Sequence, residues 1–353
     1  MDAIETLLSW AETQGITVSN VGPRVLPGRG IGIVATSPIK KDDTILDVPI
    51  PCLKTISTIP KPLTRPFPKD TAVHALLALD IALDDAPPSR PALTSLLPPA
   101  ASSLLAAQRE KFESHWSLVS AAALPGGAAV GYEDYRHAWL LVNSRTFYHT
   151  AKRHRDDHMV LQPVADLLNH APRGCSVAFD ARSFTILADR DYSPGDEIHI
   201  CYGRHSNDFL LVEYGFVMAP GENDWDEACL DDVLLPRLSD AHRRRLEERG
   251  FLGKYMLDAE TVCYRTQVAL RTLVLPPRRW AQFVDGFADG EAEQPEVDEL
   301  LREVLAAYDV EIGTRIETAG ALDEGEEFQR QMVVARWKQI QGLVRATIRK
   351  LDT

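Results

Sequence analysis

The stretch VLQPVADLLNH, residues 160–170, ends an apolar run with a cluster of polar side chains. Asp166, Asn169 and His170 flank two leucines, an arrangement that is unusual for a simple core element. The side chains of Asn169 and His170 offer the donors and acceptors that recognise the edge of a purine. Asn and His are also common at the C-terminus of a helix, so taken alone the stretch favours a purine site and a helix end equally.

Downstream, GDEIHICYG (195–203) predicts a strand that runs into Tyr202, and SNDFLLVEYGFV (206–217) predicts a short helix that runs into Tyr214. Each tyrosine is followed directly by a glycine turn. Two tyrosines placed in this way suit an aromatic pocket for a long aliphatic cationic side chain. The alternative interpretation is that both are ordinary core aromatics.

Upstream, GRGIGIVAT (28–36) is a glycine-rich loop followed by a strand-like run. A dinucleotide fingerprint requires a third glycine at position 33 and a helix after it. Position 33 is Ile, and β-branched residues follow, so the Rossmann interpretation is excluded. Two interpretations of the loop remain: a turn where the backbone closely approaches a ligand, or an ordinary tight turn. Taken alone, the motif favours the ordinary tight turn.

The order of these pieces is more specific than any one of them. GRGIGIVAT, NSRTFY (143–148), DLLNH, GDEIHICYG and NDFLLVEYGFV follow one another as in the SET domain. The chain closely resembles the branch typified by the Rubisco large-subunit methyltransferase. The resemblance covers essentially the whole length and implies an α+β fold. In it, a β-rich SET core of short strands, residues 1–222, carries a helical insert at about 50–140. An all-α substrate-binding domain, residues 223–353, follows.

The resemblance also implies a site and a cofactor, S-adenosylmethionine, which leaves as S-adenosylhomocysteine; no metal is implied. Tyr202 matches the catalytic tyrosine, and Tyr214 and Phe216 match the lysine channel. The positions that match the cofactor pocket are Arg29, Gly30, Ile31, Ser144, Arg145, Asp166, Asn169, His170, Tyr202 and Tyr214.

The implied activity is S-adenosylmethionine-dependent protein-lysine N-methylation of a non-histone or basic protein. The same fold acting on a histidine or an N-terminal amine stays open, as does a catalytically silent SET scaffold used as a binding module. A silent scaffold would be free to lose Asn169, His170, Tyr202 and Tyr214, all of which are present. The insert is rich in proline and alanine and lacks the family's usual tryptophan segment, so the resemblance does not specify the substrate.

The charge of the chain restricts the classes of molecule that it is expected to bind. Net charge is −13, which argues against general nucleic-acid binding. Residues 223–353 hold 18 Lys and Arg against 26 Asp and Glu, a difference of −8. This acidic half favours a basic or lysine-rich protein partner, although a solvated surface explains most of the charges as well. No apolar run is long enough for a membrane span. The N-terminus carries acids where a signal peptide carries bases, so a cytoplasmic or nuclear location is expected.

Local patterns predict the remaining structure. The five cysteines are scattered and odd in number, and are expected to be small buried residues. By the same local pattern, His149, His154, His158 and His170 are expected on the surface, with a metal site as the weaker alternative. Short strands are expected at 17–21, 31–36 and 44–48. Helices are expected at 72–83, 104–122, 133–147, 228–237, 239–250, 258–275, 278–288, 295–318 and 325–351.

Overall fold

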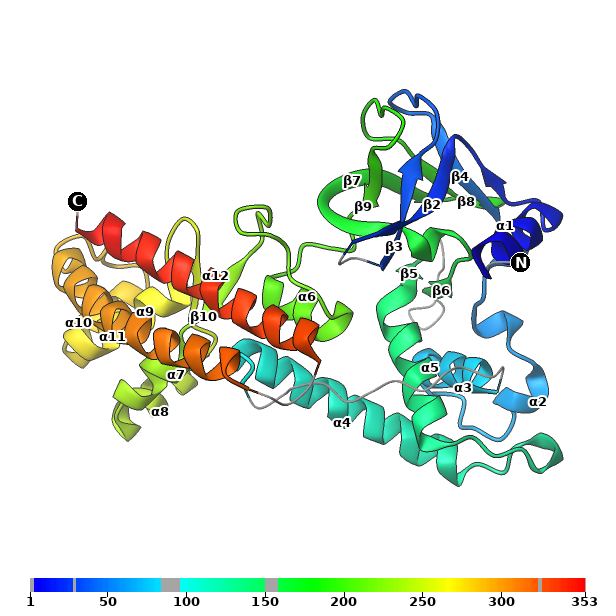
Figure 1. Cartoon of the computed structure of the whole chain (residues 1–353). Coiled ribbons are helices and arrows are strands. Elements are labelled where there is room, and N and C mark those ends of the chain that lie inside the picture. The colour runs from blue at the N-terminus through cyan, green and yellow to red at the C-terminus, as the bar shows by residue number, and fades with distance from the viewer. Residues whose placement is uncertain (1–2, 28–29, 84–95, 150–157, 323–325, 353) are drawn as a thin grey trace. The chain divides into compact units, whose positions relative to one another are not determined.

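The computed structural model describes residues 3–27, 30–83, 96–149, 158–322 and 326–352 (Figure 1). The chain divides into two compact units. The first comprises residues 1–90 and 108–204, and the second comprises residues 91–107 and 205–353. Strands dominate the core of the first unit and helices dominate the second, so the predicted α+β class is confirmed.

The main sheet of the first unit has seven strands, in the order β1-β4-β8-β7-β9-β3-β2. Every neighbouring pair is antiparallel except β7 and β9, which run parallel. The strands are β1 (Thr17–Val18), β2 (Val21–Leu26), β3 (Gly30–Ala35), β4 (Thr44–Pro49), β7 (Asn169–Phe179), β8 (Ser183–Leu187) and β9 (Glu197–Ile200).

The core of this sheet comes from β-branched and aliphatic residues that alternate along the strands. Ile33, Val48, Ile186 and Ile198 are each at most 2% exposed. Helix α1 (Ala3–Thr13) adds Ala11 to the same apolar cluster. A separate two-stranded sheet joins β5 (Thr146–Tyr148) to β6 (Met159–Leu161) in antiparallel register.

The described residues between β4 and β5 are mostly helical and have a hydrophobic cluster of their own. Leu77 on one helix and Tyr135 and Trp139 on another are fully buried in it. The α-helices of this stretch are α2 (Lys61–Thr64), α3 (Val73–Ala82), α4 (Pro99–Ala121) and α5 (Tyr132–Arg145), and short 3₁₀ turns lie at Ile50–Cys52, Ile56–Thr58 and Pro125–Gly127.

Two buried histidines lie inside this helical cluster. The His74 ring stacks on Trp139 at 4.2 Å between centroids, and its Nε2 hydrogen-bonds the Trp139 carbonyl at 3.0 Å. The Trp139 indole N–H donates to Nδ1 of His115 at 3.0 Å. Burial, as the largest cause, lowers the pKa of both histidines, to about 3 for His74 and about 4 for His115. Both rings are therefore neutral at physiological pH.

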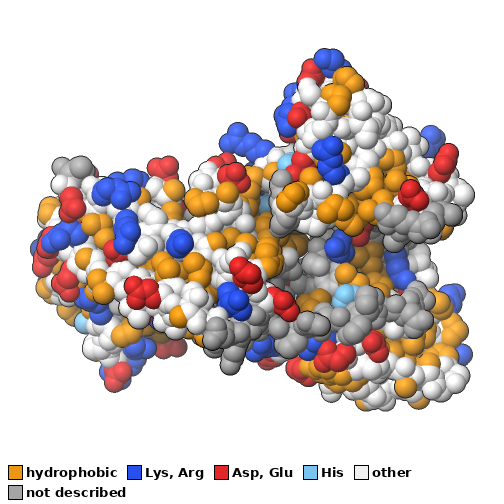
Figure 2. All heavy atoms as spheres, viewed as in Figure 1, with side chains coloured by type: hydrophobic (Ala, Val, Ile, Leu, Met, Phe, Trp, Pro, Cys, Tyr) orange, Lys and Arg blue, Asp and Glu red, His pale blue; other side chains and the backbone are white. Residues whose placement is uncertain are grey.

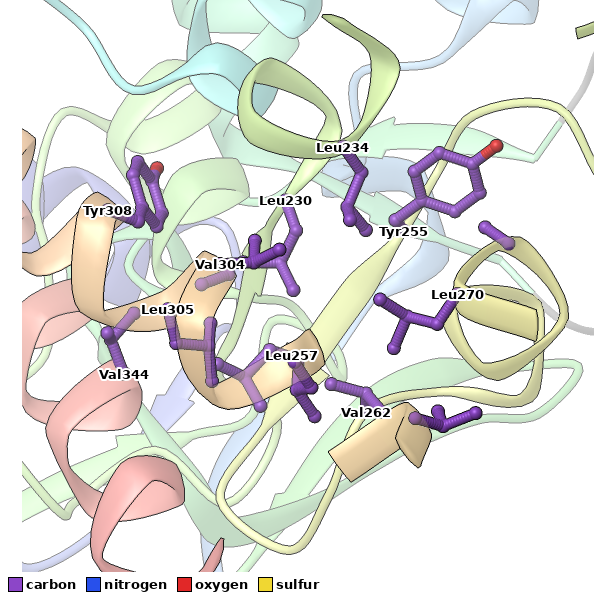
Figure 3. Packing of buried hydrophobic residues seen from close by; sticks show 14 of the residues in the cluster. Leu230, Leu234, Tyr255, Leu257, Val262, Leu270, Val304, Leu305, Tyr308 and Val344 are labelled. Carbon is purple, nitrogen blue, oxygen red and sulfur yellow. The ribbon is translucent and has the colours of Figure 1, made fainter. Parts of the chain in front are cut away.

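Helices pack around one large core in the second unit (Figure 3). The close-up shows Leu230, Leu257, Leu305 and Val344 converging from different elements. Helices α11 and α12 are the longest and lie side by side (Figure 1). The helices are α6 (Asn207–Tyr214), α7 (Asp231–Leu234), α8 (Asp240–Glu248), α9 (Tyr264–Val274), α10 (Pro277–Val284), α11 (Gln294–Gly320) and α12 (Glu327–Leu351), with a 3₁₀ turn at Leu235–Arg237.

The second unit also contains two strands where the sequence analysis expected helix. β10 (Glu227–Cys229) pairs antiparallel with β11 (Met256–Asp258), so the expected helices 228–237 and 258–275 begin later than predicted. The Asp231 carboxylate accepts hydrogen bonds from the backbone N–H groups of Lys254 and Tyr255 at 2.9 and 2.8 Å. This pairing joins segments nearly thirty residues apart, so local periodicity gives no sign of it.

Two histidines expected on the surface are buried. His149 and His158 are 4% and 8% exposed, and the His149 N–H donates to the His158 carbonyl at 2.7 Å. The His149 ring stacks on Phe179 and the His158 ring stacks on Tyr148. Aromatic stacking thus replaces hydration at both rings, and periodicity does not reveal such partners. His154 lies outside the described residues.

The cysteines follow their expectation only in part. All five are free, and Cys175 is buried, but Cys201 is exposed and the other three are half-buried. None of the helices in the described part of the chain combines the length and apolar composition that a bilayer crossing requires.

Replacing His74 with Gln should reduce the acid sensitivity of the protein. The folded pKa of His74, about 3, lies below the ordinary histidine value of about 6.5, because burial disfavours the charged ring. The unfolded chain therefore takes up a proton that the folded chain does not. Stability is complete above about pH 6.5 and falls as the pH drops toward the folded value, by up to about 1.4 kcal/mol per pH unit.

Urea unfolding at about pH 7 and about pH 5 tests this expectation. His74→Gln keeps a donor for the Trp139 carbonyl but does not titrate. Between these two conditions the variant should lose about 2 kcal/mol less stability than the wild type. An equal loss in the two proteins would mean that the buried histidine is not a source of the acid sensitivity.

Candidate functional site

The parallel pairing of β7 with β9 brings together the two polar motifs of the first unit. Asn169 lies opposite His199, and His170 lies opposite Ile200. Just beyond β9, the Tyr202 N–H donates to Nδ1 of His170 at 3.0 Å. A neutral imidazole that accepts at Nδ1 carries its hydrogen on Nε2, so this contact fixes both the tautomer and the orientation of the ring.

The Tyr202 side chain turns back onto the same motif. Its hydroxyl donates to the Leu168 carbonyl at 2.6 Å, and its ring lies 5.1 Å from the His170 ring. The phenol hydrogen is therefore committed to a backbone acceptor. A phenol oxygen that donates its hydrogen still has lone pairs with which to accept one. The hydroxyl is thus held as an oriented acceptor.

Asn169 is held by a residue that the sequence analysis did not select. Its Nδ2 donates to Oε1 of Glu197 at 2.9 Å, and the same oxygen lies 3.4 Å from Nε2 of His199. Glu197 and His199 alternate along β9 with the buried Ile198 and Ile200. That alternation was visible in the sequence, but the parallel pairing that places Glu197 beside Asn169 was not.

Gly32 of β3 lies against this pair. A Cβ added there would come within 2.5 Å of a Leu26 methyl, 2.7 Å of Asn169 Nδ2 and 3.1 Å of Glu197 Oε1. Only glycine leaves room for the hydrogen bond between Asn169 and Glu197. Gly32, the third glycine of the G-x-G-x-G loop, is thus required by the contact of Asn169 with Glu197, whereas the role of Gly30 toward a cofactor stays a prediction.

The remaining glycine-loop residues have open surroundings. Gly30 has a left-handed φ of 73°, is exposed, and would have no neighbour within 4 Å of an added Cβ. Ile31 is 37% exposed. Both lie in the antiparallel pairing of β2 with β3, opposite Leu26 and Val25. Arg29 lies outside the described residues.

Asp166 and Arg145 form an ion pair next to the same motif. Arg145 Nη1 donates to the Asp166 carbonyl at 2.9 Å and lies 3.3 Å from its Oδ2. Burial raises the pKa of Asp166, and the Arg145 charge opposes that rise. Ser144 donates its hydroxyl to the Leu140 carbonyl one turn back in α5. The role of each residue toward a cofactor stays a prediction.

The second unit carries the other two predicted aromatics. Helix α6 begins at Ser206, whose hydroxyl accepts from the Phe209 N–H, and ends at Gly215, whose φ is 80°. This left-handed glycine reverses the chain after the helix. It places Phe216 beside Tyr214, with ring centroids 6.3 Å apart. Burial raises the pKa of Tyr214.

A buried charge network, which no sequence motif predicted, holds α6 against α12. Arg336 is fully buried and binds both carboxylate oxygens of Asp208, at 2.8 and 3.0 Å, and one oxygen of Asp226, at 2.8 Å. Burial alone would lower the pKa of Arg336, but the two carboxylates outweigh it and raise the pKa. Asp208 and Arg336 are 128 residues apart, so no local pattern links them.

The first unit thus brings together five predicted residues, and the second carries Tyr214 and Phe216. Within the described ranges, no group of three or more His, Cys, Asp and Glu is arranged to hold a metal ion. The five residues gathered in the first unit are Arg145, Asp166, Asn169, His170 and Tyr202.

Two family models match the chain in succession. The SET domain matches residues 30–203, and the ribosomal lysine N-methyltransferase 2 C-terminal domain matches residues 230–350. The first range contains the whole junction of β7 and β9. The segment that carries Tyr214 and Phe216 falls between the two ranges.

Curated relatives agree with these models. The chain is 29% identical over 194 residues to the ribosomal lysine N-methyltransferase set11 of Schizosaccharomyces pombe. That match spans about half of each chain (50% and 49%). The chain is also 26% identical over 327 residues to SET domain-containing protein 4 of Mus musculus, covering 78% of this chain and 74% of the relative.

Solved structures share the fold. Rubisco LSMT bound to AdoMet superposes with a TM-score of 0.69 at 16% identity, covering 100% of this chain and 92% of the other. The SET domain of LSMT bound to lysine and AdoHcy gives a TM-score of 0.66 at 16% identity, with the same coverage.

Replacing Gly32 with Ala should destabilise the protein by displacing Asn169. The added methyl would occupy the space of Asn169 Nδ2 and break its hydrogen bond to Glu197. The expected loss is about 1–3 kcal/mol, typical of an overpacked buried site with a broken hydrogen bond. Thermal unfolding measures it.

Gly22→Ala in the neighbouring strand β2 is the matched control. An added Cβ at Gly22 would approach only the Thr36 methyl, at 3.3 Å. The control should therefore lower Tm much less than Gly32→Ala. Equal effects of the two substitutions would contradict the close approach of Gly32 to Asn169.

Proposed function

Because this chain is a SET-domain protein with a C-terminal domain of the ribosomal lysine N-methyltransferase 2 type, we propose that it methylates lysine on another protein. S-adenosylmethionine is the proposed methyl donor. The relatives that this chain matches include proteins named ribosomal lysine N-methyltransferases, from Schizosaccharomyces pombe and Saccharomyces cerevisiae. Their names support the reaction type, and the geometry of this chain supports the roles of its residues.

The observation that carries the proposal is the position of the Tyr202 hydroxyl. It is fixed by its donation to the Leu168 carbonyl, and the Tyr202 backbone is fixed by His170. An oxygen held in this way accepts a hydrogen from an incoming amine and orients the nitrogen lone pair. Tyr202 acts by positioning the nucleophile, so no covalent intermediate and no metal enter the proposed reaction.

Several residues of the first unit fit the proposed cofactor. Asn169 and His170 supply amide and imidazole groups of the kind that bind a purine edge. Gly30 has open space over its backbone, where a ligand can approach closely. Arg145, beside Asp166, provides a cation for a carboxylate. When bound, S-adenosylmethionine supplies a methyl group on a positively charged sulfur, which is already a good electrophile.

The acceptor lysine must lose its proton before it attacks. The free pKa of lysine is about 10.4, and an apolar surrounding lowers it because the charged form loses solvation. Tyr214 and Phe216 are the aromatic side chains that we assign to this task. Their rings offer an apolar wall for the methylene stem of lysine, which is the surrounding that disfavours the charged form of the amine.

For the substrate, we propose a basic, lysine-rich protein. The chain carries a net charge of −13, and residues 223–353 hold the larger part of it, −8. The visible face of the second unit mixes acidic and basic side chains (Figure 2), so long-range attraction, rather than one acidic patch, is the proposed contribution. The five free cysteines fit a reducing compartment, and we propose a cytoplasmic or nuclear location.

Calorimetric binding of S-adenosylmethionine to the purified protein is the first test. One site per chain is expected. Transfer of label from radioactive cofactor to lysate proteins, with mass spectrometry of the modified residue, then identifies the acceptor. Folded protein that binds no cofactor would replace the proposed function with a silent binding scaffold, and label on histidine or an N-terminal amine would replace the acceptor.

Tyr202→Phe should abolish methyl transfer while S-adenosylmethionine affinity stays nearly intact. The variant keeps the ring and the backbone contact to His170 but loses the oxygen that orients the amine. Tyr132→Phe is the matched control, because it removes a hydroxyl that is bonded to Glu113 elsewhere in the same unit. Loss of cofactor binding in Tyr202→Phe, or full activity in it, would refute the assigned role.

Asn169→Ala should do the opposite and weaken cofactor binding first. A lost hydrogen bond at a half-buried site costs about 1–2 kcal/mol, which raises Kd roughly tenfold. Equilibrium binding measures the change, and turnover at saturating cofactor should recover most of its wild-type value. An unchanged Kd would remove Asn169 from the proposed cofactor site.

A further inference from the structure

The segment 207–218 carries both predicted channel aromatics, Tyr214 and Phe216. It lies between the two ranges that the family models match, so neither the SET model nor the C-terminal model includes it. Its own helix, α6, is only eight residues long. A helix of that length is marginal by itself in water. The position of the two rings therefore depends on what holds this segment.

Gln339 of α12 holds both ends of the segment at once. Its side-chain oxygen accepts from Nδ2 of Asn207 at 3.0 Å, and its nitrogen donates to the Met218 carbonyl at 2.5 Å. The Met218 N–H donates in turn to Oδ1 of Asn207 at 3.2 Å. Asn207 is 2% exposed and Gln339 is 8% exposed, so water does not substitute for these bonds. One side chain thus closes residues 207–218 into a loop.

Arg336, one turn before Gln339 on α12, holds the same segment by charge. It binds Asp208 of α6 through two parallel N–H···O bonds. It also donates to Oδ2 of Asp226 and to the Glu227 carbonyl. The other oxygen of Asp226 accepts from the Asn207 N–H at 3.0 Å. A fork-shaped guanidinium with two carboxylates sets direction as well as distance.

On these contacts we infer that Arg336 and Gln339 are positioning residues for the methyl-transfer reaction, acting through segment 207–218. Arg336 and Gln339 bind the segment at Asn207, Asp208 and Met218, and so fix the backbone that carries Tyr214 and Phe216. The inference rests on the proposed function for its catalytic readout. Its physical basis is that a misplacement of about 1 Å in a reacting geometry lowers a rate by as much as roughly a hundredfold.

Gln339→Leu is the variant that tests the inference most cleanly. It keeps roughly the size of the side chain and removes both bonds to the ends of the segment, together with a 3.5 Å contact from Arg336 Nη1, while the ion pairs of Arg336 with Asp208 and Asp226 stay. We expect kcat to fall roughly tenfold, with a smaller change in the Kd of S-adenosylmethionine, because the proposed purine contacts, Asn169 and His170, lie outside the segment. Amide hydrogen exchange in residues 207–218 should become faster.

Gln341→Leu is the matched control on the same helix. Its amide donates to the Asp309 carbonyl of α11 at 3.5 Å, away from the segment. It should leave kcat and the exchange of residues 207–218 unchanged. Equal kcat in the two variants would overturn the inference, and so would faster exchange in Gln339→Leu without a fall in kcat.

Arg336→Lys, compared with Arg271→Lys, separates positioning from general stability. Arg271 is also buried in the second unit, where it binds Gln267, Gln294 and the Gly290 carbonyl. Lysine keeps each charge but loses the fork. At temperatures where both variants are folded by circular dichroism, only Arg336→Lys should lower kcat and change the ratio of mono- to higher methylated product.

Equal loss of kcat in the two arginine variants would mean that Arg336 acts through stability alone. Wild-type protein that transfers no methyl group would refute the proposed function instead. In that case the exchange comparison of Gln339→Leu with Gln341→Leu still tests whether α12 holds the segment, since it needs no activity.

Discussion

The first unit depends on one parallel pairing in a sheet that is otherwise antiparallel. Where β7 begins beside β9, the chain places Asn169 and His170 next to the strand that leads to Tyr202. From this register follow the hydrogen bond to Glu197, the tautomer of His170 and the fixed hydroxyl of Tyr202. A shift of the strand register by one residue would turn these side chains to the opposite face of the sheet and separate the residues of the site.

The proposed methyl transfer requires the protein mainly to align the amine with the methyl donor. The proposed reaction needs no metal, no covalent intermediate and no strong base, so its residues are ordinary polar and aromatic groups held by neighbours. Tyr202 is held by the Leu168 carbonyl, and segment 207–218 is held by Gln339 and Arg336. The buried arginine illustrates the cost of such order, because its charge is tolerable only with two carboxylates in place.

The sequence was informative wherever a signal was local. The long apolar helix patterns predicted α3, α11 and α12 well, and the order of short motifs predicted the fold class and the polar residues around Tyr202. It was uninformative wherever two distant segments meet. The pairing of β10 with β11, the contact of Asn169 with Glu197, and the ion pair of Asp208 with Arg336 join residues whose spacing carries no period. The burial of His149 and His158 was likewise not predictable, because it depends on stacking against Phe179 and Tyr148.

The network around Arg336 limits which segments can be exchanged between related proteins. A chimera joined near residue 222, where the family models leave a gap, would take α12 from one parent and Asn207 and Asp208 from the other. Such a hybrid keeps both ranges that the family models match, yet it divides the second compact unit and separates residues that bind one another. A functional exchange must therefore include a set of residues rather than a domain, and these residues are expected to covary among related sequences. That set is Asn207, Asp208, Asp226, Arg336 and Gln339.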